Sequence, residues 1–187
     1  MRVIAGEFKG RRLESPDWPG LRPTSDKLRE TLFNVLAPAI RGARVVDAYA
    51  GTGAVGIEAL SRGAAHVTFV ERHPRAVRLI ETNLLRCGVD SERYAIIRAG
   101  FADAIQRLAG APPDVIFLDP PYGELALDEA LEAAGPLAGD ATLVVVEHAF
   151  RAGAPAEAGG LVRTRSLRSG DSALAFYRRP TRSRGSA

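Results

Sequence analysis

From about Ala43 onward, segments with the residue pattern of β-strands alternate with segments that have the pattern of helices. When a helix connects two neighbouring parallel strands, the crossover is right-handed, and helices come to cover both faces of the sheet. We therefore expect an α/β fold with a mostly parallel, seven-stranded sheet and a C-terminal antiparallel strand pair. The predicted strands are 45–46 with its flanks, 66–70, 94–97, 115–118, 142–147, 161–167 and 173–178, and the predicted helices are 54–61, 74–86, 101–108 and 125–134.

The first forty residues precede this alternation. They predict a short β-hairpin with strands at 2–5 and 11–14, because glycines lie near the intervening turn. A helix is expected next, with Thr24 or Ser25 as its N-cap and Pro38 at its end. The predicted divisions are an N-terminal hairpin and helix at 1–40, a main domain at 41–180 and a disordered tail at 181–187.

Composition narrows the class of protein. Hydrophobic residues make up 46% of the 187-residue chain, which is enough for the core of one domain. Apolar runs stay far below the roughly 20 residues of a membrane span. The single cysteine, Cys87, allows no internal disulfide, and the three histidines lack the spacing of metal ligands. We expect a monomeric cytoplasmic protein without a metal.

The charge is unevenly distributed, although the net charge is only +3. Seven arginines and a single acid, Asp171, follow Leu161, and further basic residues lie near the N-terminus. Basic ends around a near-neutral middle favour a polyanionic partner. A solvated surface that only promotes solubility explains the same pattern equally well.

A glycine-rich segment, Asp-Ala-Tyr-Ala-Gly-Thr-Gly-Ala-Val-Gly at 47–56, joins the first predicted strand to its helix. Gly51, Gly53 and Gly56 have the spacing of the dinucleotide-binding fingerprint, and Glu71 follows about 20 residues later at the end of the second strand. Glycines let the backbone approach a ligand, and an acid at that strand end can hold ribose hydroxyls. The pattern alone fits both NAD and S-adenosylmethionine.

Asp47 favours S-adenosylmethionine. Its carboxylate is predicted at the end of the strand, beside the glycine-rich turn. A pyrophosphate would be repelled there, whereas the ammonium and sulfonium groups of S-adenosylmethionine would be attracted. Two plainer interpretations stay open: Asp47 caps the following turn, and Glu71 is a surface acid paired with Arg72.

The most specific pattern is Asp119-Pro120-Pro121-Tyr122, directly after the buried-looking strand at 115–118. The strand places Asp119 at the carboxyl edge of the sheet, where open α/β folds bind ligands. Two consecutive prolines stiffen the turn. Such a turn suits one chemical problem, because the amino group of a nucleobase is a poor nucleophile whose lone pair is delocalised into the ring. Hydrogen bonds to Asp119 and the Pro120 carbonyl would orient this amine, and Tyr122 would stack on the base, which has to be unpaired or flipped.

Together these segments resemble the class I methyltransferases that carry an Asn/Asp-Pro-Pro-Tyr/Phe motif. The N-terminal third narrows the resemblance through Met-Arg-Val-Ile-Ala-Gly at 1–6, Gly-Arg-Arg-Leu at 10–13, Leu-Arg-Pro-Thr at 21–24 and Arg-Glu-Thr-Leu-Phe-Asn at 29–34. These motifs are similar to those of the bacterial 16S rRNA guanine-N2 methyltransferase family, often called RsmD. The resemblance implies a Rossmann-like class I fold, S-adenosyl-L-methionine as the cofactor, and methylation of one guanine 2-amino group in ribosomal RNA within an assembling small subunit.

The resemblance also implies roles for individual residues. Many class I enzymes place an acid near the adenine amine, but this chain has Gly100 and Phe101 there, so adenine recognition would depend on backbone and apolar contacts. The implied cofactor residues are Asp47, Ala48, Gly51, Gly53, Glu71, Arg72, Gly100, Phe101 and Asp119. The implied catalytic residues are Asp119, Pro120, Pro121 and Tyr122, and the implied RNA contacts are Arg2, Lys9, Arg11, Arg12, Arg22 and Thr24.

Three other functions are weighed against this one. A DNA adenine-N6 methyltransferase uses the same amine chemistry, but it usually needs a sizeable target-recognition region, for which 187 residues leave little room. An NAD-dependent oxidoreductase is disfavoured by Asp47. A non-catalytic ribosome-assembly factor is disfavoured by the intact Asp119 and Tyr122.

Overall fold

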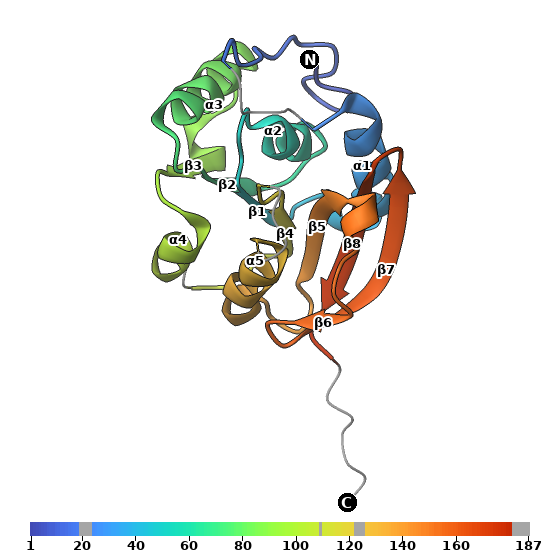
Figure 1. Cartoon of the computed structure of the whole chain (residues 1–187). Coiled ribbons are helices and arrows are strands. Elements are labelled where there is room, and N and C mark those ends of the chain that lie inside the picture. Colours follow the sequence, from blue (N-terminus) through green and yellow to red (C-terminus); the bar gives the residue numbers. More distant parts are fainter. Residues whose placement is uncertain (19–23, 109, 122–125, 181–187) are drawn as a thin grey trace, which may run out of the picture.

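The computed structural model describes residues 1–18, 24–108, 110–121 and 126–180. Within them, one eight-stranded sheet has the order β3-β2-β1-β4-β5-β8-β7-β6 (Figure 1). The five strands from β3 to β5 are mutually parallel, and the last three pair antiparallel. The strands are β1 (Arg44–Ala48), β2 (His66–Val70), β3 (Tyr94–Ile97), β4 (Val115–Leu118), β5 (Leu143–Ala149), β6 (Glu157–Ala158), β7 (Leu161–Ser169) and β8 (Ser172–Arg178).

Helices cover both faces of this sheet, as the alternation predicts (Figure 1). One core cluster joins α1, α2 and α3 to the sheet, and a second joins α4 and α5 to its other face. The helices are α1 (Asp26–Ile40), α2 (Ala54–Ser61), α3 (Pro74–Arg86), α4 (Phe101–Leu108) and α5 (Ala126–Ala134), with short 3₁₀ turns η1 (Ser91–Arg93), η2 (Gly135–Leu137) and η3 (Phe150–Ala152).

The central strands are apolar on both faces because each face is covered by helices. All four residues of β4 are buried, and they alternate between the two core clusters. Phe117 packs toward α1–α3, whereas Ile116 and Leu118 pack toward α4 and α5. Because side chains point alternately to the two faces along a strand, this alternation also decides on which face of the sheet the side chain after the strand lies.

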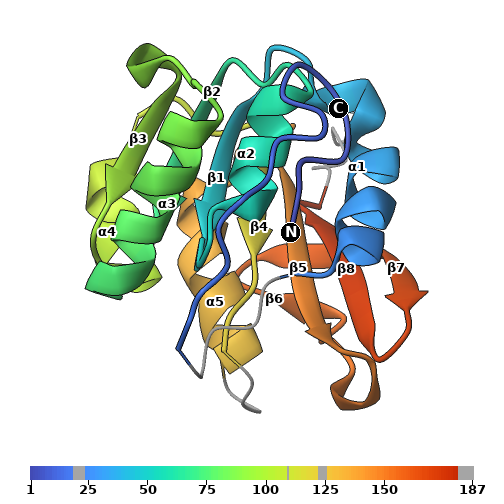
Figure 2. The same ribbon diagram turned by 90° about the horizontal axis from the view of Figure 1, so that it is seen from above.

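The N-terminal segment pairs with itself less extensively than a full hairpin. Arg2 and Arg12 form one antiparallel bridge, and Leu13 N donates to the Met1 carbonyl at 3.1 Å. The pairing continues to Val3, whose N–H donates to the Arg11 carbonyl at 3.0 Å, and it stops there because the N–H groups of Ile4 and Ala5 donate to the buried carboxylate of Glu58 on α2, at 2.8 and 3.0 Å. Figure 2 shows this segment crossing over α2.

Three further details differ from the sequence prediction or refine it. Ser25 is the N-cap of α1, since its hydroxyl accepts from Leu28 N at 3.2 Å. Pro38 does not end that helix, which continues to Ile40, whose side chain is buried in the core. The eighth strand is the two-residue β6. The predicted tail at 181–187 lies outside the described residues.

A fully buried arginine ties α1 to the N-terminal segment. Arg29 Nη2 donates to the Arg2 carbonyl at 2.8 Å and to the Asp26 carboxylate at 2.6 Å. Val3 and Phe8 belong to the core cluster that also contains side chains of the central strands. The N-terminal segment is therefore packed into the same core as the sheet.

Candidate active site

A pocket of about 840 Å³ opens at the carboxyl ends of the parallel strands, a volume suited to a cofactor-sized ligand. Residues that follow β1, β2, β3 and β4 all line it, as the topology of open α/β sheets predicts. The predicted site residues that line it are Thr24, Asp47, Gly51, Glu71, Arg72, Gly100, Phe101, Asp119, Pro120 and Pro121.

Other predicted site residues do not line this pocket. Ala48 is fully buried within β1, and Gly53 begins α2 in a left-handed conformation with φ of 75°. Tyr122 and Arg22, which the sequence assigned to the base and to RNA, lie outside the described residues.

The glycine-rich turn brings α2 close to the sheet. Gly51 has a φ of 55°, in the region that favours glycine. A Cβ on Gly56 would lie 2.3 Å from the Phe69 ring on β2, so only glycine lets the helix pack at this distance. Tyr49 also has a positive φ, of 60°, and its ring packs against Phe101 with the two centroids 5.8 Å apart.

Asp47 lies at the base of the pocket and is almost completely buried. Its Oδ2 accepts a hydrogen bond from Gly56 N at 2.8 Å, so the interpretation of Asp47 as a cap of the following turn is confirmed. Burial raises the pKa of Asp47 to about 8, and the nearby charge of Glu71 adds to the rise, while the Gly56 hydrogen bond opposes it. A cationic ligand beside this buried carboxyl would favour its ionised form.

Glu71 holds the turn from the neighbouring strand end. Its Oε2 accepts from Gly51 N at 2.9 Å, and its Oε1 accepts from His73 N at 2.7 Å. The side chain is 9% exposed, so the alternative of a surface acid is wrong. Glu71 therefore fixes the position of the glycine-rich turn while also lining the pocket.

Asp119 follows β4 on the side of the sheet that carries Asp47. Burial raises the pKa of Asp119 well above its ordinary value, and the charges of Glu147 and Asp47 raise it further. Pro120 and Pro121 continue along the pocket wall. The site thus holds several carboxyl groups in one partly closed space, an arrangement that selects ligands with positive charge or with N–H donors.

Several residues that line the pocket were not predicted from the sequence. Trp18 contributes an aromatic wall: its ring stacks on His73 with centroids 6.2 Å apart, and the Arg75 guanidinium lies over the Trp18 ring, 5.6 Å from its centroid. Glu147 in β5 and Ser172 in β8 line it as well. Glu147 could have been found, since it ends the predicted strand at 142–147 and therefore occupies the same edge as Asp119.

The predicted RNA contacts of the N-terminal segment lie on the surface rather than in the pocket. Arg2, Lys9 and Arg12 are exposed. Arg11 is exposed too, but its guanidinium donates to the Cys87 carbonyl and packs over the Phe8 ring at 5.2 Å. Part of its hydrogen-bonding capacity is therefore used within the protein.

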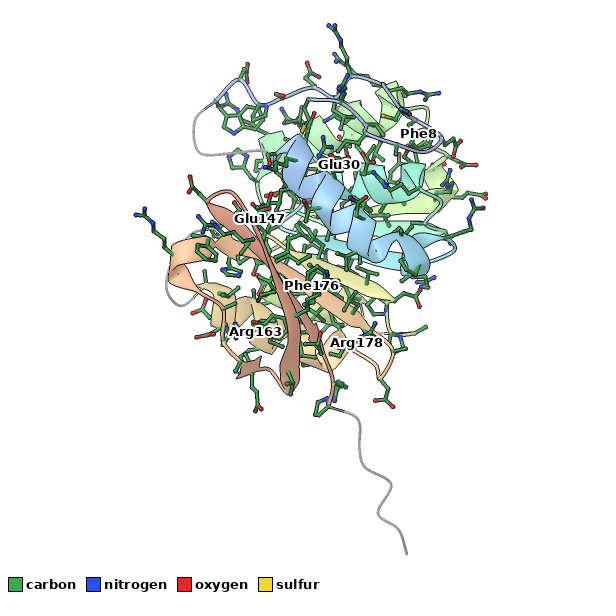
Figure 3. All side chains as sticks on the ribbon, turned by 90° about the vertical axis from the view of Figure 1, so that its right-hand side faces the viewer. Phe8, Glu30, Glu147, Arg163, Phe176 and Arg178 are labelled. Carbon is green, nitrogen blue, oxygen red and sulfur yellow. The ribbon has the colours of Figure 1, made fainter. Side chains whose placement is uncertain are left out.

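The C-terminal arginines are also partly used internally. Arg178 donates to the Ala141 carbonyl at 2.8 Å, and Arg163 donates to the Ala154 carbonyl. Figure 3 shows both at the end of the sheet away from Glu147, in agreement with the pairing of Arg178 with Val162 at the start of β7. These two arginines do not surround the pocket entrance.

The part of the chain that the structure describes provides neither a candidate metal site nor a candidate membrane span. No group of three or more His, Cys, Asp or Glu residues there could hold a metal ion. No helix in those ranges is long and apolar enough to cross a membrane.

The sheet order, the glycine-rich turn after β1 and the acidic Pro-Pro turn after β4 define a class I methyltransferase fold with its ligand pocket at the usual sheet edge. The family model described as Conserved hypothetical protein 95 matches residues 1–178. Ribosomal RNA small subunit methyltransferase D of Escherichia coli strain K12 is 38% identical over 189 residues, which cover 96% of this chain and 90% of that protein. The chain belongs to this family.

Solved structures agree with the assignment. The Escherichia coli protein yhhF superposes with a TM-score of 0.80 at 32% identity, covering 96% of this chain and 97% of that one. The more distant SMU.776, whose structure is complexed with SAH, has a TM-score of 0.64 at 13% identity and covers 80% of this chain and 49% of that one. The second likeness shows the fold alone.

Proposed function

We propose that this protein transfers a methyl group from S-adenosyl-L-methionine to the 2-amino group of a guanine in small-subunit ribosomal RNA. Membership of a family of ribosomal RNA small subunit methyltransferases supports the reaction class and the kind of RNA. The observation that carries the chemistry is the placement of Asp119 and Pro120 in the same pocket as Asp47 and Gly51. One part of the pocket suits a cationic cofactor, and the other suits an amine donor.

The pocket residues fit the cofactor. Asp47 is a buried carboxyl whose pKa of about 8 would fall on contact with a cation, so binding the cationic methionine end would offset its desolvation. Gly51 lies in the turn after β1, and Glu71 lies at the end of the neighbouring strand β2, where the ribose is expected. When bound, S-adenosyl-L-methionine supplies an electrophilic methyl group. The SAH complex of SMU.776, a protein with the same fold, supports this choice of cofactor.

The chain's own residues would prepare the amine. In the reaction, a bond forms between the guanine N2 and the methyl carbon, the bond from that carbon to sulfur breaks, and N2 loses a proton. Asp119 and the Pro120 carbonyl would accept hydrogen bonds from the two amine hydrogens and so orient the lone pair. The raised pKa of Asp119 makes its carboxylate a stronger base toward the departing proton than an ordinary aspartate. Tyr122, the next residue after the two prolines, would stack on the base.

The proposal extends to the setting of the reaction. Arg2, Lys9, Arg12, Arg22 and Thr24 are the proposed RNA contacts, and Arg11 joins them with the part of its guanidinium that the fold leaves exposed. The assembling subunit as substrate, a monomeric enzyme and a cytoplasmic location stay predictions.

Transfer of a labelled methyl group to purified small-subunit RNA, followed by digestion to nucleosides, tests the proposal. We expect the label in N2-methylguanosine with the wild-type protein and labelling slower by about 10²–10³-fold with Asp119→Ala. Label in N6-methyladenosine would support the adenine alternative. No transfer to naked RNA or to assembling subunits would overturn the proposal.

A further inference from the structure

Three carboxylates form a row across neighbouring strands at the edge of the pocket. Asp47 lies on β1, Asp119 follows β4, and Glu147 lies on β5. The pairing of Leu118 with Val146 places Asp119 next to Glu147 in the sheet. All three line the pocket. They share one face of the sheet, because the residues two positions earlier, Val45, Phe117 and Val145, all belong to the core cluster of α1, α2 and α3.

The order of the strands assigns different neighbours to these three side chains. The proposed cofactor residues Gly51 and Glu71 follow β1 and β2, on one side of Asp119. Glu147 lies on β5, on the other side of Asp119. A ligand that contacts both Asp119 and Glu147 therefore extends away from the cofactor. Under the proposed function, that ligand is the target base.

Guanine presents two kinds of N–H donor side by side on its Watson–Crick edge, the 2-amino group and N1–H. Adenine carries an unprotonated N1 on the same edge, which accepts and does not donate. Enzymes that take a base out of its stack identify it by hydrogen bonds to this edge. A second carboxylate next to the one that holds the amine therefore attracts guanine and repels adenine.

We propose that Glu147 accepts a hydrogen bond from N1–H of the target guanine and so makes the enzyme selective for guanine. This inference rests on the proposed function. The Glu147 side chain is only 7% exposed, and its charge contributes to the raised pKa of Asp119, so the two carboxyl groups are close neighbours in the pocket.

The test compares Glu147→Gln with the wild type on two RNAs that differ only at the target position. One carries guanine, and the other carries 2-aminopurine, which keeps the 2-amino group but has an acceptor at N1. We expect the wild type to prefer guanine strongly in kcat/KM. The glutamine amide can donate to N1, so the ratio of guanine to 2-aminopurine should fall by at least about tenfold in the variant, since a site built for one hydrogen-bond pattern rejects another.

The matched control is Glu157→Gln, which changes an exposed glutamate on β6, and it should leave the ratio unchanged. If Glu147→Gln loses turnover on both RNAs, equilibrium binding of the same two RNAs supplies the ratio, and binding of SAH shows that the variant is folded. An unchanged ratio in Glu147→Gln would overturn the role of Glu147. A wild type that methylates neither RNA would instead overturn the proposed function.

Discussion

Replacing Asp47 with asparagine is expected to stabilise the ligand-free protein and to weaken its binding of S-adenosylmethionine. The side chain is 2% exposed, and the hydrogen bond that its Oδ2 accepts from Gly56 N can be kept by the amide oxygen of asparagine. The substitution therefore removes the buried charge while it preserves the start of α2. The two effects have opposite signs, which makes the pair of measurements hard to explain by general damage.

The size of the first effect follows from the pKa of Asp47. In the folded protein the pKa is about 8, against 3.8 for an ordinary aspartate, so the folded state binds the proton more tightly than the unfolded chain. Stability of the wild type is thus full below the lower value and falls as the pH rises toward the higher one. At about 1.36 kcal/mol per pH unit, the loss at pH 7 is at most roughly 4 kcal/mol. We expect Asp47→Asn to recover roughly 1–3 kcal/mol of it, because the new amide N–H₂ also needs partners.

Urea unfolding at several pH values measures the first effect, and calorimetry with S-adenosylmethionine measures the second. The difference in unfolding free energy between variant and wild type should be small at acid pH and should grow toward pH 8. Cofactor binding should weaken by roughly 10–100-fold, the usual scale for a hydrogen bond to a charged group. Asp140→Asn, at an exposed acid, is the control for both. A variant that is less stable than the wild type at pH 8 and binds the cofactor equally well would refute the reasoning.

The remaining predictions concern the chemical step, the RNA and the fold. Asp119→Ala should lower the single-turnover rate by about 10²–10³-fold. Asp119→Asn should be less affected, since the amide oxygen still accepts a hydrogen bond, and equal rates for the two variants would contradict this role. Tyr122→Phe should keep much of the activity and Tyr122→Ala should lose it, because stacking needs only the ring; if both were inactive in the same assay, stacking would be the wrong role. Arg12→Ala should weaken RNA binding and reduce the slope of log affinity against log salt concentration by about 0.7–0.9, without changing cofactor affinity in calorimetry. An RNA affinity and a salt slope equal to those of the wild type would mean that Arg12 is only a solvated surface residue. Gly56→Ala should destabilise the protein by about 1–3 kcal/mol in urea unfolding, because its Cβ would lie 2.3 Å from the Phe69 ring, and an unchanged midpoint would argue against that packing.

The fold was predictable because the sheet is buried on both faces. Each central strand is a short apolar run, and each is separated from the next by a helix with one apolar stripe. The helix 54–61 and the strand 66–70 were therefore predicted with the bounds that the structure has. The N-terminal hairpin was harder to predict, since its extent depends on Glu58, a distant residue that takes the N–H groups of Ile4 and Ala5.

The candidate site was predictable where a residue follows a strand in a recognisable motif. Asp47, Glu71 and Asp119 all lie at strand ends and line one pocket. Trp18 was not predictable, because its place beside His73 depends on how the N-terminal segment crosses the molecule. Glu147 was missed for another reason. It also lies at the carboxyl end of a predicted strand, where open α/β sheets bind ligands, but no sequence motif surrounds it.

Mass mapping of methylated guanines in small-subunit ribosomal RNA tests the central claim most directly. The RNA would come from a strain that lacks this protein and from the same strain complemented with the wild type or with Asp119→Ala. The account predicts that one N2-methylguanosine disappears in the deletion strain, returns with the wild type and stays absent with Asp119→Ala. An identical set of methylated guanines in all three strains, or the loss of a methyl group from a different base, would contradict it.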